Sequence, residues 1–202
     1  GDRRFDDERR WAAAELWATT REDSFLVAAI PTARDTATVP GWPNVGTLGL
    51  YTLLHHRATL PRTVDVQGLE RMLLDLARPL AGHAQSSPYA VPMGITPRDF
   101  AWGSSAVAAN QGIVLVQAWR LTRDTMYLNA ASSAMDWLLG RNATGYSFVT
   151  GFGGRQPMAP HHRPSVGDTV RAPVPGLLVG GPNPGQQDKC AGYPSPLPAR
   201  SD

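Results

Sequence analysis

The sequence holds one cysteine, Cys190, and one lysine, Lys189. A single cysteine excludes an internal disulfide framework and every cysteine-rich zinc module. Charged residues make up only 18% of the chain and the net charge is +2, with the arginines scattered along the sequence. Because non-specific nucleic-acid binding needs several basic contacts to phosphate, we expect no nucleic-acid partner.

Long apolar runs are also absent. No stretch of 18 apolar residues occurs, so we expect no transmembrane helix and no membrane partner. The first residues, Gly1 to Glu8, contain no apolar core of the kind that a signal peptide carries. They lead directly into a helical pattern, and we therefore expect the chain to be cut from something longer.

The composition describes an ordered protein with much loop. Hydrophobic residues form 42% of 202 residues, which is enough for a core in one domain or in part of a larger one. The 20 glycines and 18 prolines are a high number for that length.

Apolar residues at helical spacing predict six helices, and no strand pattern of comparable length competes. Asp124 is the predicted N-cap and Gly140 the predicted stop of the sixth helix, and Pro79 should kink or end the fourth. Very short gaps favour antiparallel neighbours, so residues 1–140 are expected to form three helical hairpins. The predicted helices are residues 6–20, 25–30, 46–57, 63–83, 104–122 and 125–139.

The pattern changes from residue 141 onward. Residues 141–202 contain 10 glycines and 10 prolines and almost no amphipathic periodicity. A segment of this length without regular structure is usually functional or disordered. Because Phe148, Phe152 and Tyr193 are among its apolar anchors, we expect an ordered loop region that lies over the end of the helices.

The densest polar cluster lies in this region, at His161, His162 and Arg163. Adjacent histidines point differently and lack the i, i+4 spacing of ligands on a helix, which disfavours a shared metal. One histidine packed in the loop and one exposed is the simplest alternative. A histidine and an arginine together also offer the hydrogen-bond donors that hold sugar hydroxyls or a carboxylate. The glycines of residues 151–154 lack the ending of a phosphate-binding loop.

Three other features allow two interpretations each. The acidic run Asp6-Asp7-Glu8 is typical of a solvated first helical turn, but it also offers oxygen ligands to a hard cation such as calcium. The aromatic residues Trp42, Trp102 and Tyr146 lie in or beside predicted loops, where they are either edge-of-core residues or flat platforms for sugar rings. Asn142-Ala143-Thr144 fits a glycosylation sequon, although such triplets are common by chance.

A family resemblance is carried by residues 7–8 with 11–16, residues 100–104 with 110–112, residues 136–142, residues 147–153, residues 160–165 and residues 173–183. These blocks resemble glycoside hydrolase family 9, a family of cellulases that are mostly endo-β-1,4-glucanases. The blocks occur in the family's order and span nearly the whole chain. The form Ala13-Ala14-Glu15-Leu16 is most similar to members with an N-terminal immunoglobulin-like domain.

The resemblance implies a fold and an activity. The family fold is an all-α barrel of six helical hairpins, (α/α)6, of which this chain would form about half, with a long ordered C-terminal loop. Family members hydrolyse internal β-1,4-glucosidic bonds with inversion, for which one carboxylate activates water and a second carboxylic acid protonates the leaving oxygen. The resemblance places the base in an Asp-Ala-Gly-Asp motif upstream and the acid in an Asn-Glu motif downstream. Neither motif occurs in these 202 residues, so no acidic residue here inherits either role.

The resemblance also assigns binding residues. His161 and Arg163 match the family's active-site histidine and its companion arginine, which hold glucose hydroxyls near the cleavage point. Trp102 and Trp42 are similar to aromatic subsite platforms, and Tyr146 is taken as a further substrate-binding residue.

Calcium is the implied cofactor. Asp7 and Glu8 match a pair that binds calcium in some family members. Arg3 and Arg4 stand where small ligating residues would be expected, and Pro43 and Asn44 stand where many relatives have acids.

The leading hypothesis is therefore that the chain is part of a secreted, extracellular cellulase domain, and that it binds a β-glucan polysaccharide or cello-oligosaccharide. On this hypothesis the chain is inactive without the missing remainder of the catalytic domain. The alternative is a non-catalytic carbohydrate-binding fragment. A third hypothesis is a helical-barrel enzyme for another polysaccharide, such as xyloglucan or chitosan.

Overall fold

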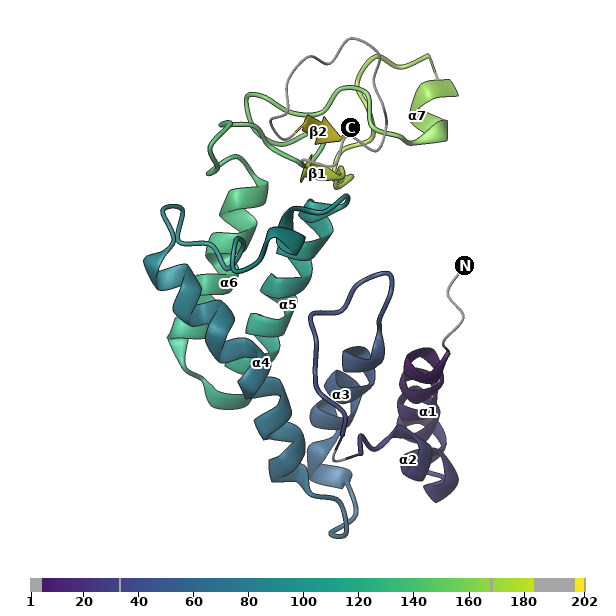
Figure 1. Ribbon diagram of the computed structural model, residues 1–202. Coiled ribbons are helices and arrows are strands. Elements are labelled where there is room, and N and C mark those ends of the chain that lie inside the picture. Colours follow the sequence, from purple (N-terminus) through teal and green to yellow (C-terminus); the bar gives the residue numbers. More distant parts are fainter. Residues whose placement is uncertain (1–4, 33, 168, 184–198, 202) are drawn as a thin grey trace.

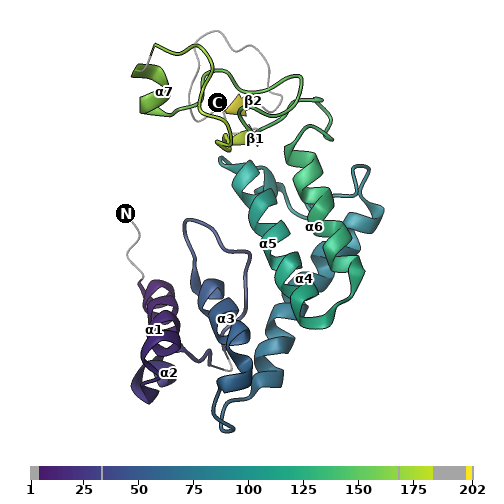
Figure 2. The same cartoon turned by 180° about the vertical axis from the view of Figure 1, so that it is seen from behind.

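The computed structural model describes residues 5–32, 34–167, 169–183 and 199–201. In both views the helices form two groups, α1 to α3 and α4 to α6, that diverge toward one end of the molecule (Figures 1 and 2). The described chain that follows α6, at residues 139–167 and 169–183, forms a loop layer over the ends of α5 and α6 (Figure 1). The helices are α1 (Asp6–Thr20), α2 (Asp23–Ala29), α3 (Gly46–His55), α4 (Val66–Ser86), α5 (Ser104–Thr122), α6 (Thr125–Leu138) and the short α7 (Arg163–Gly167), with 3-10 turns at Arg57–Thr59 and Pro97–Phe100.

The all-α expectation is confirmed, and the caps explain several of the boundaries. The predicted N-cap of α6 is present, because the Asp124 carboxylate accepts a hydrogen bond from the Met126 N–H at 2.9 Å. Gly140 follows α6 with a φ of +118°, which favours glycine and ends the helix. The Asp65 carboxylate caps α4 through the Gly68 N–H at 2.8 Å, so α4 begins three residues later than predicted.

Pro79 was expected to kink or end the helix at residues 63–83. It does not end α4, so that part of the prediction is wrong. The helix continues through Pro79 to Ser86. Pro79 itself is exposed, whereas Ala77, Leu80, Ala81 and Ala84 on both sides of it are buried. Burial of this apolar face therefore outweighs the loss of one backbone donor.

Two apolar clusters hold the molecule together. The larger one takes buried side chains from each of the helices α1 to α6, with Trp17, Leu53, Leu73 and Leu115 among the most deeply buried. The second one joins α5 and α6 to the loop layer through Ala108, Trp137, Phe148 and Val179. Helix α1 packs against both α2 and α3, and α5 packs against both α4 and α6.

Backbone hydrogen bonds order the loop layer. The Phe148 N–H donates to the Leu138 carbonyl at the end of α6 at 2.7 Å, and the Val179 N–H donates to the Phe148 carbonyl at 2.9 Å. An isolated antiparallel bridge pairs Val149 with Leu178. The strands β1 (Gly181–Asn183) and β2 (Ala199–Ser201) pair antiparallel with Gly181 opposite Ser201. The predicted ordered loop is thus present in its described part, while residues 184–198 and 202 lie outside the described residues.

No helix among the described residues is long and apolar enough to cross a membrane.

The crossing of α1 and α3 depends on a residue without a side chain. A Cβ atom on Gly49 would lie 3.2 Å from the Trp11 Cα and 3.4 Å from the Arg10 carbonyl oxygen. We expect Gly49→Ala to lower the free energy of unfolding by about 1–3 kcal/mol, because overpacking outweighs the gain in helix propensity. Chemical denaturation measures the change.

The matched control is Gly82→Ala in α4, where a Cβ would meet nothing within 4 Å. This substitution should stabilise the chain by about 0.5–1 kcal/mol, because alanine is the better helix former. Equal effects of the two substitutions would contradict the proposed close approach at Gly49.

His56 follows the C-terminal end of α3 and is expected to make stability depend on pH. The His56 ring meets the edges of Trp17 and His55 at centroid distances of 6.2 Å and 4.9 Å. Burial lowers the pKa of His56, and the charges of Arg21 and His55 lower it further against the opposing effect of Glu15.

As the pH falls below about 6.5, His56 therefore becomes protonated in the unfolded state before it does in the folded state. This protonation favours the unfolded state. We expect the melting temperature to fall between about pH 7.5 and pH 5.5, and to fall less in His56→Gln. Calorimetry over that range is the measurement, and equal slopes for both proteins would rule His56 out.

Candidate functional site

A groove lies between the start of α5 and the loop layer. Its volume is about 650 Å³. Trp102 and His161 both line it, and both are exposed, Trp102 by 62% of its surface. The other lining residues are Gly103, Ala106, Ala159, Pro160, His162, Leu177, Leu178, Val179 and Gly180.

Short contacts between α5 and the loop layer fix one wall of the groove. The Ser105 N–H donates to the Gly180 carbonyl at 3.0 Å, and the Ser104 hydroxyl donates to the Pro182 carbonyl at 2.6 Å. Trp102 stands directly before the Gly103 N-cap, whose φ of +84° turns the chain into α5. The aromatic ring and the wall formed by residues 177–180 are therefore held by the same helix start.

The two adjacent histidines have different environments. His161 is exposed, whereas His162 is half-buried and its Nδ1 lies 2.9 Å from the Ser165 hydroxyl. The His162 N–H donates to the Pro160 carbonyl at 2.6 Å. Both histidines line the groove, but His162 is hydrogen-bonded within the loop, and His161 is the exposed one of the two. Arg163 is exposed at the first position of α7.

Tyr146 and Asn142 have structural contacts. The Tyr146 ring is half-buried with its centroid 6.1 Å from that of Phe148, at the edge of the second apolar cluster. Asn142 in the sequon is only 8% exposed, and its Nδ2 donates to the Trp137 and Tyr146 carbonyls at 2.8 and 2.9 Å. Its Oδ1 accepts from Thr144, so this triplet forms a turn.

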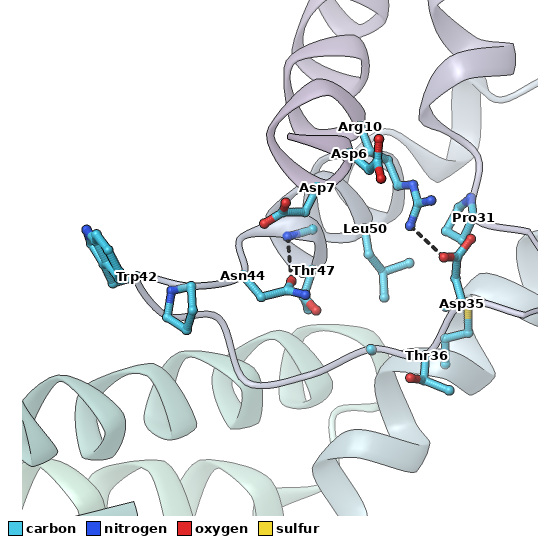
Figure 3. Close-up of a pocket in the computed structure, with 14 residues that line it drawn as sticks. Asp6, Asp7, Arg10, Pro31, Asp35, Thr36, Trp42, Asn44, Thr47 and Leu50 are labelled. Atoms are coloured by element: carbon cyan, nitrogen blue, oxygen red, sulfur yellow. Dashed lines mark hydrogen bonds and ion pairs between the residues drawn. The ribbon is translucent and has the colours of Figure 1, made fainter. Parts of the chain in front are cut away.

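Trp42 lies at a second hollow of about 640 Å³, between the starts of α1 and α3. Asp6, Asp7, Arg10, Asp35 and Asn44 also line it (Figure 3). The Trp42 side chain is 86% exposed and points away from the other labelled residues (Figure 3). The structure thus brings together Trp102 and His161, but places Trp42 with the acidic residues.

One ion pair lies at the second hollow. The Arg10 guanidinium lies 3.0 Å from the Asp35 carboxylate, which also accepts hydrogen bonds from the Thr32 backbone and hydroxyl. Burial raises the pKa of Asp35, but these donors from Thr32 and Arg10 outweigh it and leave the pKa below its usual value. Sequence reasoning missed this pair, because residues 10 and 35 belong to different segments and no motif links them.

The residues predicted to hold calcium do not fit a calcium site as described. The Asp7 Oδ2 accepts the Val45 N–H at 2.8 Å, and the Asn44 Oδ1 accepts the Gly46 N–H at 3.1 Å. Within the described part of the chain, no group of three or more His, Cys, Asp or Glu side chains is placed to hold a metal ion. Calcium requires six to eight oxygen ligands. Arg3 and Arg4, which entered the prediction, lie outside the described residues.

An exposed indole, an exposed imidazole and an apolar leucine around one groove suit a ring with an apolar face and a rim of hydroxyls. An all-helical scaffold with such a groove is what a carbohydrate-active protein of the helical-barrel class requires. Comparison with known proteins places it in one family. Residues 1–193 match the family described as Glycosyl hydrolase family 9, and the chain belongs to that family.

Its relatives include named glucanases. The chain is 41% identical over its whole length to the xyloglucan-specific endo-beta-1,4-glucanase BoGH9A of Bacteroides ovatus, of which it covers 35%. It is 33% identical to endoglucanase D of Acetivibrio thermocellus, with 90% of this chain and 29% of that protein matched. The chain therefore spans about a third of the length of these curated relatives.

Solved structures agree with the sequence relatives. The Bacteroides ovatus GH9 structure matches 91% of this chain and 34% of its own, with a TM-score of 0.83 and 40% identity. AaCel9A in complex with cellobiose-like isofagomine matches 99% of this chain and 38% of its own, with a TM-score of 0.82 and 33% identity. The expectation of a partial (α/α)6 barrel is confirmed.

Gly181 determines how closely the groove wall approaches α5. Its φ is +85°, and a Cβ there would overlap the Ser105 hydroxyl and lie 2.7 Å from the Ser104 hydroxyl. We expect Gly181→Ala to destabilise the chain by about 2–4 kcal/mol, from backbone strain together with overpacking. Chemical denaturation measures the loss.

Gly176→Ala separates these two causes. Gly176 also has a positive φ, of +92°, but a Cβ there meets nothing within 4 Å. The Gly176→Ala substitution should therefore lower the free energy of unfolding by backbone strain alone, about 1–2 kcal/mol. A loss at Gly176 as large as that at Gly181 would show that the approach to α5 is not tight.

Proposed function

We propose that this chain forms the substrate-binding part of an inverting hydrolase of β-1,4-glucans. The observation that carries the proposal is the groove in which Trp102 and His161, 59 positions apart, meet at the start of α5. The family of the chain and the endoglucanases among its relatives support the same activity.

Each group has a role in this proposal. The Trp102 indole stacks on the apolar face of a glucose ring, and Leu178 extends that apolar surface. The His161 imidazole and the Arg163 guanidinium hydrogen-bond to hydroxyls of the sugar and orient it for attack by water. Trp42 is proposed as a platform for a more distant sugar, and Tyr146 contributes through the position of the loop. Calcium at Asp7 and Glu8 has no part in these steps.

The proton transfers are assigned to carboxylates outside this chain. No Asp or Glu side chain is among the described residues that line the groove. Inversion needs two carboxyl groups about 6.5–9.5 Å apart on opposite sides of the scissile bond. We therefore assign the Asp base and the Glu acid to the remainder of a longer catalytic domain, which acts outside the cell.

The test is turnover by the 202-residue chain. General acid and general base each contribute about 10²–10⁴-fold, so the chain should release no reducing sugar above background from carboxymethylcellulose or xyloglucan. Xyloglucan is included because a relative at 41% identity is named as xyloglucan-specific. Turnover by the purified chain would show that the catalytic carboxylates are among its own residues.

Binding is measured separately by calorimetry with cellotetraose and a xyloglucan oligosaccharide. Trp102→Ala and His161→Ala should each weaken binding by about 5- to 100-fold, which corresponds to about 1–3 kcal/mol for a stacked ring or a hydrogen bond to a sugar. Phe152→Ala is the matched control, because Phe152 is an exposed aromatic residue of the same layer that is not among the groove residues.

Binding without turnover by the chain also fits the alternative of a non-catalytic carbohydrate-binding fragment. The two are distinguished by adding the remainder of the longer protein, which restores turnover only if the chain belongs to a catalytic domain.

A further inference from the structure

The start of α1 is joined to the start of α3 by one carboxylate. The Asp7 Oδ2 accepts the Val45 N–H at 2.8 Å across 38 positions of sequence. Figure 3 shows Asp7 beside the turn that holds Asn44 and Trp42.

That turn is closed on itself. Gly41 and Asn44 exchange two backbone hydrogen bonds, with N···O distances of 2.9 and 3.1 Å. The Asn44 side chain then accepts the Gly46 N–H at 3.1 Å, where α3 begins. Trp42 therefore lies in a small turn closed by hydrogen bonds, and the turn is connected to α1 through Val45 and Asp7.

Gly46 lies within ordinary van der Waals distance of both segments. A Cβ on Gly46 would lie 3.4 Å from the Asp7 Cβ and 3.5 Å from the Asn44 Oδ1. The two oxygens that a bridging cation would use, on Asp7 and on Asn44, both accept backbone N–H groups. The nearby Asp35 is paired with Arg10 at 3.0 Å. The Asp7 Oδ2, the Asn44 Oδ1 and the Asp35 carboxylate are thus each already bound by a protein donor.

We infer that Asp7 acts as a direct clamp, in which its carboxylate holds the Trp42 turn through the Val45 N–H and takes the place of a bridging calcium ion. Asp7 is in this sense a positioning residue for Trp42. The inference concerns the joint between α1 and α3, and it stands whether or not the chain binds a glucan.

The substitution Asp7→Asn distinguishes a clamp from a metal ligand. An asparagine Oδ1 can still accept the Val45 N–H, whereas loss of the carboxylate charge weakens a calcium ligand. Asp7→Ala removes the acceptor altogether. Asp6→Ala is the matched control, because Asp6 lies in the same first turn of α1 and the carboxylate that accepts the Val45 N–H is that of Asp7.

Thermal unfolding of the 202-residue chain is measured in excess calcium and in excess EDTA. We expect the two melting temperatures to agree within about 1 °C, and Asp7→Ala to lower both by about 2–6 °C. Asp7→Asn should recover most of that loss in either condition, and Asp6→Ala should lower the melting temperature less than Asp7→Ala does. Terbium, a luminescent probe for calcium sites, should show no saturable binding that Asp7→Ala abolishes.

Two results would overturn the inference. A rise in melting temperature with calcium that Asp7→Asn abolishes would establish Asp7 as a metal ligand. Equal losses in Asp7→Asn and Asp7→Ala without any calcium effect would show that the charge of Asp7, rather than its hydrogen bond to Val45, holds the two helices.

Discussion

The groove depends on the contact between the first turn of α5 and the chain at residues 180–182. Two carbonyl groups of the loop layer, on Gly180 and Pro182, are hydrogen-bonded by Ser105 and Ser104. Because a buried carbonyl without a donor costs free energy, this contact fixes the height of the layer above the helix. Trp102 stands directly before the same helix start, so this contact sets the position of the Trp102 backbone relative to the opposite wall of the groove. Glycine at position 181 is what permits the approach.

Dense glycine and proline do not leave the loop layer without structure, because its backbone groups find partners in one another. Thr150 illustrates this, since its N–H donates to the Leu177 carbonyl while its carbonyl accepts the Gly176 N–H. Its buried hydroxyl donates to the Val174 carbonyl at 2.6 Å and accepts the Leu177 N–H at 2.9 Å. Phe148 supplies the apolar anchor beneath this pairing. A few buried side chains suffice because the hydrogen bonds settle the conformation of the rest.

The helices could be predicted from sequence where local signals agree. Helix α5 has its predicted bounds, since its apolar spacing and its flanking residues point to the same limits, and the Asp124 cap of α6 is as predicted. The effect of Pro79 could not be predicted from sequence, because whether a proline ends a helix depends on the tertiary burial of the residues around it. Which helices pack together is also a long-range matter, as the contact of Gly49 with the backbone of α1 shows.

For the candidate site, the sequence indicated residue types but not how they combine. His161 and Trp102 meet in one groove, while Trp42 lines a different hollow and Tyr146 packs against Phe148. An aromatic residue in a loop has the same local signature whether it covers a core or faces a ligand, so only the fold separates the two. The Asp7 carboxylate is a similar case. From sequence alone, an acidic pair at the start of a helix fits a metal ligand and an acceptor for a neighbouring backbone N–H equally well.

The carboxylates of the chain explain why binding and bond cleavage are assigned to different parts of the barrel. A general acid needs a raised pKa at neutral pH, yet Asp7 and Asp35 have lowered pKa values, Asp7 chiefly through the Val45 N–H and Asp35 through donors that outweigh its burial. Asp65, Asp99 and Asp124 accept backbone N–H groups at helix or turn starts. These hydrogen bonds stabilise local structure, and the lowered pKa values of Asp7 and Asp35 favour the ionised form, which cannot protonate a leaving oxygen. Trp102 and His161, by contrast, are exposed at the groove, as the proposed binding of a sugar ring requires, and the proposal therefore takes the carboxylic acid from another part of the barrel.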